Sequence, residues 1–172
     1  KILFLSKKYE DVPFLIFDLL KNPFKKSICN TLVMLNVLEH IENDNLALRE
    51  ANKLLQEDGI LILEVPSGKF LYDDYDKKLL HYRRYQMNEL VKKIENERFE
   101  IEYKTHLGFL IFPIFAFIKL FNIIFKNTNI VTKQAKASNN ILLKILLGIE
   151  KKVRKFYLPF GIRCYVCARK KL

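Results

Sequence analysis

Three short apolar runs divide the first third of the chain, and each predicts a buried β-strand. They are VPFLIF at Val12–Phe17, NTLVMLNVL at Asn30–Leu38 and ILILEVP at Ile60–Pro66. The first two runs do not alternate between apolar and polar residues, so both faces of their strands should be covered. This pattern is typical of a parallel sheet with helices on each side.

Two helical segments accompany these strands. Asn43 or Asp44 can cap a helix that runs to Leu55 and buries one apolar face. Gly59 supplies the turn that ends this helix. A second helix is expected from about Met87 to Asn96.

The later strands follow a different pattern. FEIEYKTHL at Phe99–Leu107 alternates, which predicts a half-exposed strand, and a last strand is expected near Ile162–Ala168. The polar and aromatic stretch SGKFLYDDYDKKLLHYRRY should form a loop with some helical turn. The alternation of strands and helices therefore predicts an α/β fold with an antiparallel pair at the end of its sheet.

An apolar and basic segment separates the last two strands. Leu107–Ile118 contains no charged residue, and apolar residues recur at helical spacing over 141–153 among lysines. A membrane span needs about 20 apolar residues, whereas Lys119 and Asn122 interrupt this run. Two interpretations are favoured: a basic amphipathic structure lying in a membrane interface, or a helical cap packed on the sheet. A true membrane span is the least favoured alternative.

The positive charge is concentrated in the second half of the chain. The 172 residues are enough for one domain with a real core, and their net charge is +11. Residues 1–86 balance 13 basic against 13 acidic side chains, whereas residues 104–172 hold 14 basic side chains and one acid. This half should attract phospholipid, nucleic acid or a phosphorylated substrate, unless the charge only solubilises the surface.

The three cysteines do not indicate a disulfide framework or a metal site. Their number is odd, so we expect reduced thiols in the cytoplasm. Cys164 and Cys167 lie three positions apart on a predicted strand, where their side chains point to opposite faces. The sequence therefore predicts no metal site. A cytoplasmic location is also compatible with a peripheral contact at the inner face of the membrane.

One short stretch, VLEHIEND at residues 37–44, indicates a functional site. An apolar strand ends at Asn36 and is followed directly by Glu39 and His40. Polar and titratable groups at the end of a buried strand are typical of a strand that opens onto a site.

The order of motifs around this stretch resembles one known family. VLEHIENDNLALREANKLLQEDGILILEVP, followed by HYRRY and a closing LPFGIRCYVCARK, is similar to class I S-adenosylmethionine-dependent methyltransferases of the type 11-like branch. The resemblance covers roughly residues 12–107 and 158–170.

The resemblance implies a Rossmann-like, mostly parallel sheet with an antiparallel final hairpin, and transfer of a methyl group from S-adenosylmethionine. The cofactor would lie across the carboxyl ends of the strands. The matching cofactor-binding positions are Asp18, Leu19, Asn36, Val37 and Glu39.

The resemblance places further residues on the substrate side. His40 and His81 are the candidate catalytic groups, because a neutral imidazole can orient a substrate or accept a proton. Arg83, Arg84 and Tyr85 are the candidate substrate contacts, since arginine binds anionic groups in a bidentate manner. In the alternative interpretations, the Glu-His pair only braces the next helix and HYRRY is a solvated loop.

The family's Gly-rich loop and its ribose-binding acid have no counterpart here, since residues 1–11 contain no glycine. We therefore expect an N-terminally truncated chain that lacks the first two strands. Residues 1–106 would form the C-terminal portion of the core, 107–157 a helical insert, and 158–172 the final strand. A missing N-terminal half is then a candidate partner.

The predicted function is methyl transfer to a lipid-linked or anionic small molecule. A nucleic-acid methyltransferase is less favoured, because the basic residues accompany aliphatic stripes rather than exposed stacking aromatics. The other alternative is a catalytically inactive, membrane-associated fragment or interaction module.

Overall fold

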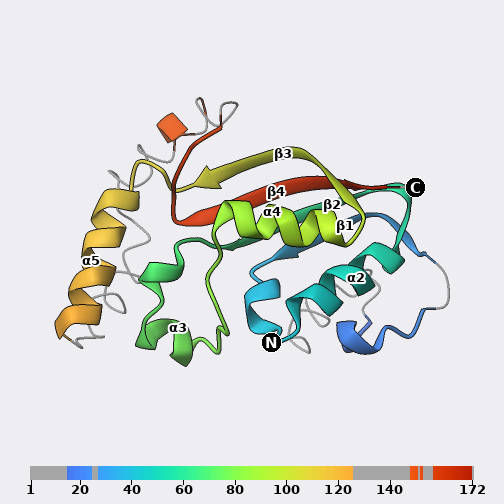
Figure 1. The fold of residues 1–172 in the computed structure, drawn as a ribbon, viewed down its shortest axis with the longest axis horizontal. Coiled ribbons are helices and arrows are strands. Elements are labelled where there is room, and N and C mark those ends of the chain that lie inside the picture. Colours follow the sequence, from blue (N-terminus) through green and yellow to red (C-terminus); the bar gives the residue numbers. More distant parts are fainter. Residues whose placement is uncertain (1–14, 25–26, 126–147, 151, 153–156, 172) are drawn as a thin grey trace, which may run out of the picture.

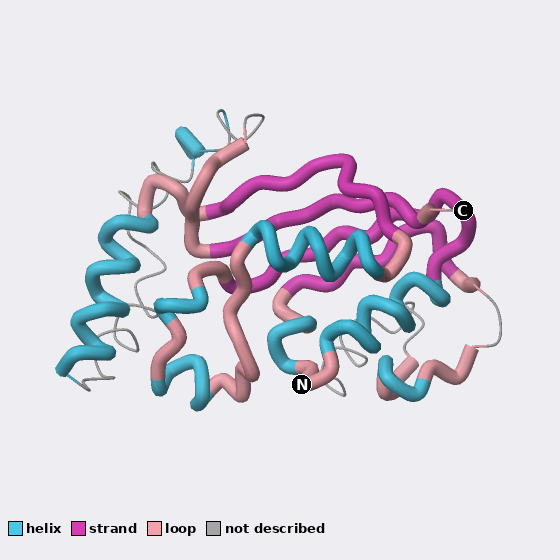
Figure 2. Tube along the Cα trace, in the orientation of Figure 1, coloured by secondary structure: helices cyan, strands magenta, loops and turns pink. Residues whose placement is uncertain are grey.

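A computed structural model describes residues 15–24, 27–125, 148–150, 152 and 157–171. Four strands form one mixed sheet in the order β1-β2-β4-β3 (Figures 1 and 2). β1 and β2 are parallel, and β4 runs antiparallel to both of its neighbours. The predicted α/β fold with a reversed final hairpin is therefore confirmed. The strands are β1 (Cys29–Leu35), β2 (Leu55–Pro66), β3 (Phe99–Leu107) and β4 (Arg163–Lys170).

Along the chain, the helices of the described residues lie between these strands, except for one short turn that precedes β1. The α-helices are α2 (Asp44–Leu54), α3 (Asp74–Lys78), α4 (Met87–Asn96) and α5 (Phe112–Phe125), and the short 3-10 turns are η1 (Leu19–Lys21), η2 (Leu38–His40) and η3 (Lys69–Leu71). Parallel strands need a crossover connection, and α2 lies in the one between β1 and β2. The side chain of Asn43 caps α2 by accepting a hydrogen bond from the backbone of Leu46 at 3.0 Å.

The core lies between one face of the sheet and the helices α2 and α4, which cross that face in Figure 1. Leu61 and Leu63 of β2 are fully buried in this core together with Leu48 and Leu90. The other face is not covered by the described residues: Val33 of β1 is 52% exposed. Among the described residues only one helical layer packs on β1, so the expectation that both of its faces are covered is not met by this part of the chain.

Two predicted elements differ from the structure. Residues 15–17 of the expected strand Val12–Phe17 are irregular and exposed, and residues 12–14 lie outside the described residues. An apolar run forms a strand only where a neighbouring strand completes its hydrogen bonds, and β1 pairs only with β2 among the described residues.

The second difference lies at the start of β2. This strand begins at Leu55 rather than Ile60, because Leu55 pairs with Cys29 before residues 56–59 interrupt the register. The left-handed residue in this interruption is Asp58, with φ 57°. Gly59 has a different role from the predicted one: a Cβ there would lie 2.9 Å from the carbonyl oxygen of Gln56.

Helix α5 has an inverted distribution of polar and apolar residues. Lys119 and Asn122, which interrupt the apolar run, are its buried residues, with exposed fractions of 1% and 4%. Its large apolar side chains face outward: Ile114, Phe117, Leu120, Phe121, Ile123 and Ile124. No helix in the described part of the chain is both long and apolar enough to cross a membrane. The second amphipathic segment of the insert lies largely outside the described residues.

Candidate functional site

The strand β1 ends in a left-handed residue that turns the chain out of the sheet. Asn36 has φ 54°, and its backbone N–H donates to the carbonyl oxygen of Glu64 in β2 at 3.0 Å. Its side-chain oxygen accepts a hydrogen bond from Arg163, which also pairs with the Glu64 carboxylate at 3.1 Å. The carboxyl ends of β1 and β2 and the start of β4 are thereby joined.

Glu39 lies directly beyond this turn and is fully buried. Neither of its carboxylate oxygens has a hydrogen-bond partner among the described residues. Burial raises the pKa of the Glu39 carboxyl, and its own backbone N–H together with His40, His81 and Arg163 offsets this only partly. The carboxylate makes no hydrogen bond to α2, so the interpretation that Glu39 braces that helix has no support.

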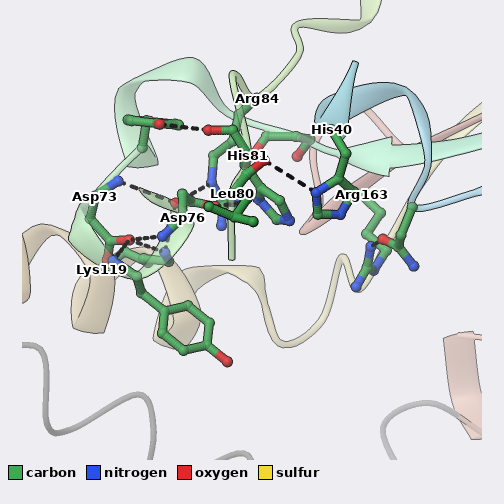
Figure 3. Close-up of polar contacts among 12 residues, drawn as sticks. His40, Asp73, Asp76, Leu80, His81, Arg84, Lys119 and Arg163 are labelled. Atoms are coloured by element: carbon green, nitrogen blue, oxygen red, sulfur yellow. Dashed lines mark hydrogen bonds and ion pairs between the residues drawn. The ribbon is translucent and has the colours of Figure 1, made fainter. Parts of the chain in front are cut away.

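His40 and His81 come together although 40 residues separate them in the sequence. Their ring centroids lie 4.7 Å apart in an edge-to-face arrangement. The Nδ1 atom of His40 lies 3.2 Å from the carbonyl oxygen of Leu80, and Nδ1 of His81 lies 3.1 Å from Asp76 Oδ1 (Figure 3). Both rings line an open cavity of about 490 Å³, and its other lining residues are Tyr72, Lys77, Leu80 and Tyr82.

Asp76 anchors the segment that carries His81. It is fully buried and accepts hydrogen bonds from Arg84 and Lys119, each at 2.9 Å. Burial alone would raise its pKa, but the two cations hold the pKa of the Asp76 carboxyl well below its usual range. Asp76 is therefore ionised, and it holds α5 and the residues after α3 in place (Figure 3).

The predicted substrate contacts in HYRRY are held by the protein itself. Arg83 pairs with Asp44 at 2.9 Å. Arg84 is buried against Asp76 and donates to the carbonyl oxygen of Ser67. The hydroxyl of Tyr85, which is also buried, lies 3.1 Å from Asp44. These contacts give the three residues a bracing role, and substrate binding through them stays a prediction.

The predicted cofactor residues lie in two places. Asn36, Val37 and Glu39 follow β1 beside the histidines, whereas Asp18 and Leu19 belong to the η1 segment, which packs near α2. Asp18 caps η1 by accepting a hydrogen bond from Leu20 at 3.0 Å, and it does not line the cavity beside His40. Contact between these residues and a cofactor stays a prediction.

Sequence reasoning missed the groups that position the site. His81 is oriented by Asp76, helix α5 by Lys119, and Asn36 by Arg163. Each of these three charged residues comes from a different part of the chain. Only Lys119 left a signal, as a lone charged residue within an apolar helix.

Comparison with known proteins supports the resemblance. Residues 3–63 match a family model described as a methyltransferase domain. An S-adenosylmethionine-dependent methyltransferase from Mesorhizobium loti has a similar structure, with a TM-score of 0.55 and 10% identity over 90% of this chain and 68% of that chain. The fold is that of a class I S-adenosylmethionine-dependent methyltransferase.

Two further matches show how this methyltransferase fold is used. A [4+2]-cyclase, SpnF, matches with a TM-score of 0.58 and 16% identity over 99% of this chain. Phosphoethanolamine N-methyltransferase 2 of Haemonchus contortus, bound to phosphomonomethylethanolamine and S-adenosylhomocysteine, matches with a TM-score of 0.57 and 15% identity over 99% of this chain. The chain spans 61% of the cyclase and 40% of the Haemonchus enzyme. No curated protein matches the sequence significantly.

Proposed function

We propose that this chain supplies one part of a pocket in which S-adenosylmethionine donates a methyl group to an acceptor. The observation that carries the proposal is the turn after β1, where Asn36, Glu39 and His40 leave the carboxyl edge of the sheet beside an open cavity. Ligands of open α/β sheets bind at this edge. The match to the methyltransferase-domain family over residues 3–63 supports the same assignment.

The two groups of predicted residues then have separate roles. The turn at Asn36 and Val37 lies against the methionine portion of the cofactor, and Asp18 accepts a hydrogen bond from the adenine amino group. His40 and His81 lie on the acceptor side, since both line the cavity. SpnF has a similar fold but is a [4+2]-cyclase, so the reaction needs a test that does not depend on the fold.

Calorimetric titration with S-adenosylhomocysteine tests the cofactor assignment. We expect the chain to bind it, and we expect Asp18→Ala to weaken binding about tenfold, the effect of losing one hydrogen bond. Glu57→Ala is the matched control, because Glu57 is an exposed acid in the interruption of β2. No measurable binding by the unaltered chain would refute the proposal and would favour an inactive interaction module.

The acceptor side is suited to an anionic amphiphile at a membrane surface. The outward face of α5 is apolar, with Phe117 71% and Ile124 71% exposed. Residues 104–172 carry 14 basic side chains against one acid, so this face would approach anionic lipid favourably. The Haemonchus enzyme was solved with a phosphorylated amine, and the cavity here includes one cationic side chain, Lys77.

Co-sedimentation with vesicles tests the membrane contact. We expect binding to vesicles that contain anionic phospholipid, weaker binding to zwitterionic vesicles, and a loss with Phe117→Asp. Val33→Asp is the matched control, because Val33 is an exposed apolar residue on the sheet rather than on α5. An equal loss of vesicle binding in both variants would argue against the membrane assignment. So would binding of the chain to RNA, but not to vesicles, at physiological salt.

A further inference from the structure

Three side chains of metal-binding type meet beside the cavity. The ligand atoms offered by Glu39, His40 and His81 all lie within 4.8 Å of one another. Glu39 and His40 belong to η2, whereas His81 follows α3, so the fold rather than the sequence brings them together. Figure 3 shows His40 and His81 near each other.

A hydrogen-bond partner lies at Nδ1 of each imidazole, which leaves Nε2 as the available ligand atom. Nδ1 of His40 faces the carbonyl oxygen of Leu80, and Nδ1 of His81 faces the carboxylate of Asp76. Neither the carbonyl oxygen nor the ionised carboxylate can donate a proton, so in a neutral imidazole Nδ1 carries the hydrogen and Nε2 keeps its lone pair. Metal-binding histidines have this same arrangement, in which an outer carbonyl or carboxylate fixes the tautomer and the ring orientation.

The carboxylate of Glu39 has no hydrogen-bonded counter-charge among the described residues. It is fully buried, and neither oxygen has a hydrogen-bond partner among the described residues. A buried charge is costly unless it is paired or coordinates a metal. Arg163, the nearby guanidinium, is bound to Asn36 and Glu64 instead. A cation bound by Glu39 and by one nitrogen of each imidazole would give the buried carboxylate its missing partner.

We propose that Glu39, His40 and His81 bind one divalent transition-metal ion of the Zn²⁺ or Fe²⁺ class. Two imidazole nitrogens and one carboxylate suit such ions, whereas Mg²⁺ and Ca²⁺ prefer oxygen ligands. Bonds of about 2.0–2.2 Å require the ligand atoms to approach one another further, and the exposed His40 ring can rotate to allow this. The remaining coordination positions face the cavity and would take an oxygen ligand.

This inference concerns the acceptor side of the pocket but does not depend on methyl transfer. The sequence predicted no metal site, because only the cysteine pair had metal-ligand spacing. His40 and His81 are too far apart in the sequence to form a recognisable ligand motif, and Glu39 gave no sign that it is buried without a partner.

Metal titration of the untagged chain without cofactor tests the proposal. Co²⁺ is followed by its visible absorption and Zn²⁺ by calorimetry. We expect one ion per chain, with affinity reduced at least about tenfold in His40→Ala and in Glu39→Gln, since loss of even an outer partner of a ligand costs that much. His106→Gln is the matched control, because His106 is the third histidine of the chain and lies outside the cluster.

Four outcomes would overturn the proposal. They are no binding of Co²⁺ or Zn²⁺, binding that survives His40→Ala, binding that needs the histidines but not Glu39, and equal loss in His106→Gln. His40 is exposed, so His40→Ala should fold, and circular dichroism of each variant verifies this. Binding of S-adenosylhomocysteine is measured separately without metal, so failure of one proposal is distinguishable from failure of the other.

Discussion

The ion pairs of Lys119 should make a large contribution to stability, and Lys119→Met tests this. The ammonium group is 1% exposed and lies 2.6 Å from Asp73 Oδ1 and 2.9 Å from Asp76 Oδ2. Methionine keeps much of the side-chain volume and suits the apolar sequence of α5. The substitution therefore isolates the loss of the charge.

The expected loss of stability depends on which partners the carboxylates of Asp73 and Asp76 keep in the variant. Removing one partner of a buried ion pair costs about 3–5 kcal/mol. Asp76 retains Arg84 at 2.9 Å, and Asp73 retains its hydrogen bonds from the backbone of α3. We therefore expect a loss at the low end, about 3 kcal/mol. This is a large fraction of the roughly 5–15 kcal/mol that a domain of this kind has in total.

Urea denaturation followed by circular dichroism measures the effect, since the chain has no tryptophan to report by fluorescence. Lys53→Met is the matched control: Lys53 pairs with Glu50 at 2.7 Å, but its side chain is 59% exposed. Exposed pairs contribute less than about 1 kcal/mol. If both variants lose the same small amount, the buried network does not hold α5 to the core and the reasoning is wrong.

Three further predictions concern other parts of the chain. Burial lowers the pKa of His106 below its usual value, so its neutral form is favoured in the folded state. The unfolded state then binds more protons than the folded state below about pH 6.5. In urea titrations, the stability advantage of the unaltered chain over His106→Asn should therefore shrink from pH 7.5 to 5 rather than stay constant. Burial raises the pKa of the Cys164 thiol to about 12. Thiol reagents should therefore modify the half-buried Cys29 and Cys167 before Cys164, and equal rates for all three would contradict the buried position of Cys164. A Cβ at Gly161 would lie 2.6 Å from a backbone oxygen of β3, whereas one at Gly148 meets nothing within 4 Å; Gly161→Ala should therefore lower the free energy of unfolding by about 1–3 kcal/mol, and Gly148→Ala should not.

Local patterns in the sequence predicted several elements correctly. The helix at Met87–Asn96 and the strand at Phe99–Leu107 have the predicted bounds. Asn43 caps α2 as expected, and Cys164 and Cys167 of β4 differ in burial as opposite faces require. These features depend on neighbouring residues and on the helical or strand period, so the sequence contains what determines them. The order of motifs also pointed to the methyltransferase fold.

Other features depend on contacts between distant residues. Residues 15–17 have the composition of a strand, but no described strand pairs with them. Lys119 interrupts an apolar run in the sequence, and only the position of Asp73 and Asp76 shows that it points inward. The exposed face of β1 likewise depends on which elements pack against it.

By itself, the sequence determined the fold class and the bounds of the elements with a clear period, such as Met87–Asn96 and Phe99–Leu107, and it predicted a site where the chain leaves β1. The tertiary structure alone decided what that site contains. His40 meets His81 because the segment after α3 folds back over the turn that follows β1. Glu39 is buried there, and neither of its carboxylate oxygens has a hydrogen-bond partner among the described residues. The physical reason is that periodicity and capping act within a few residues, whereas desolvation and charge pairing depend on every group that the fold brings near.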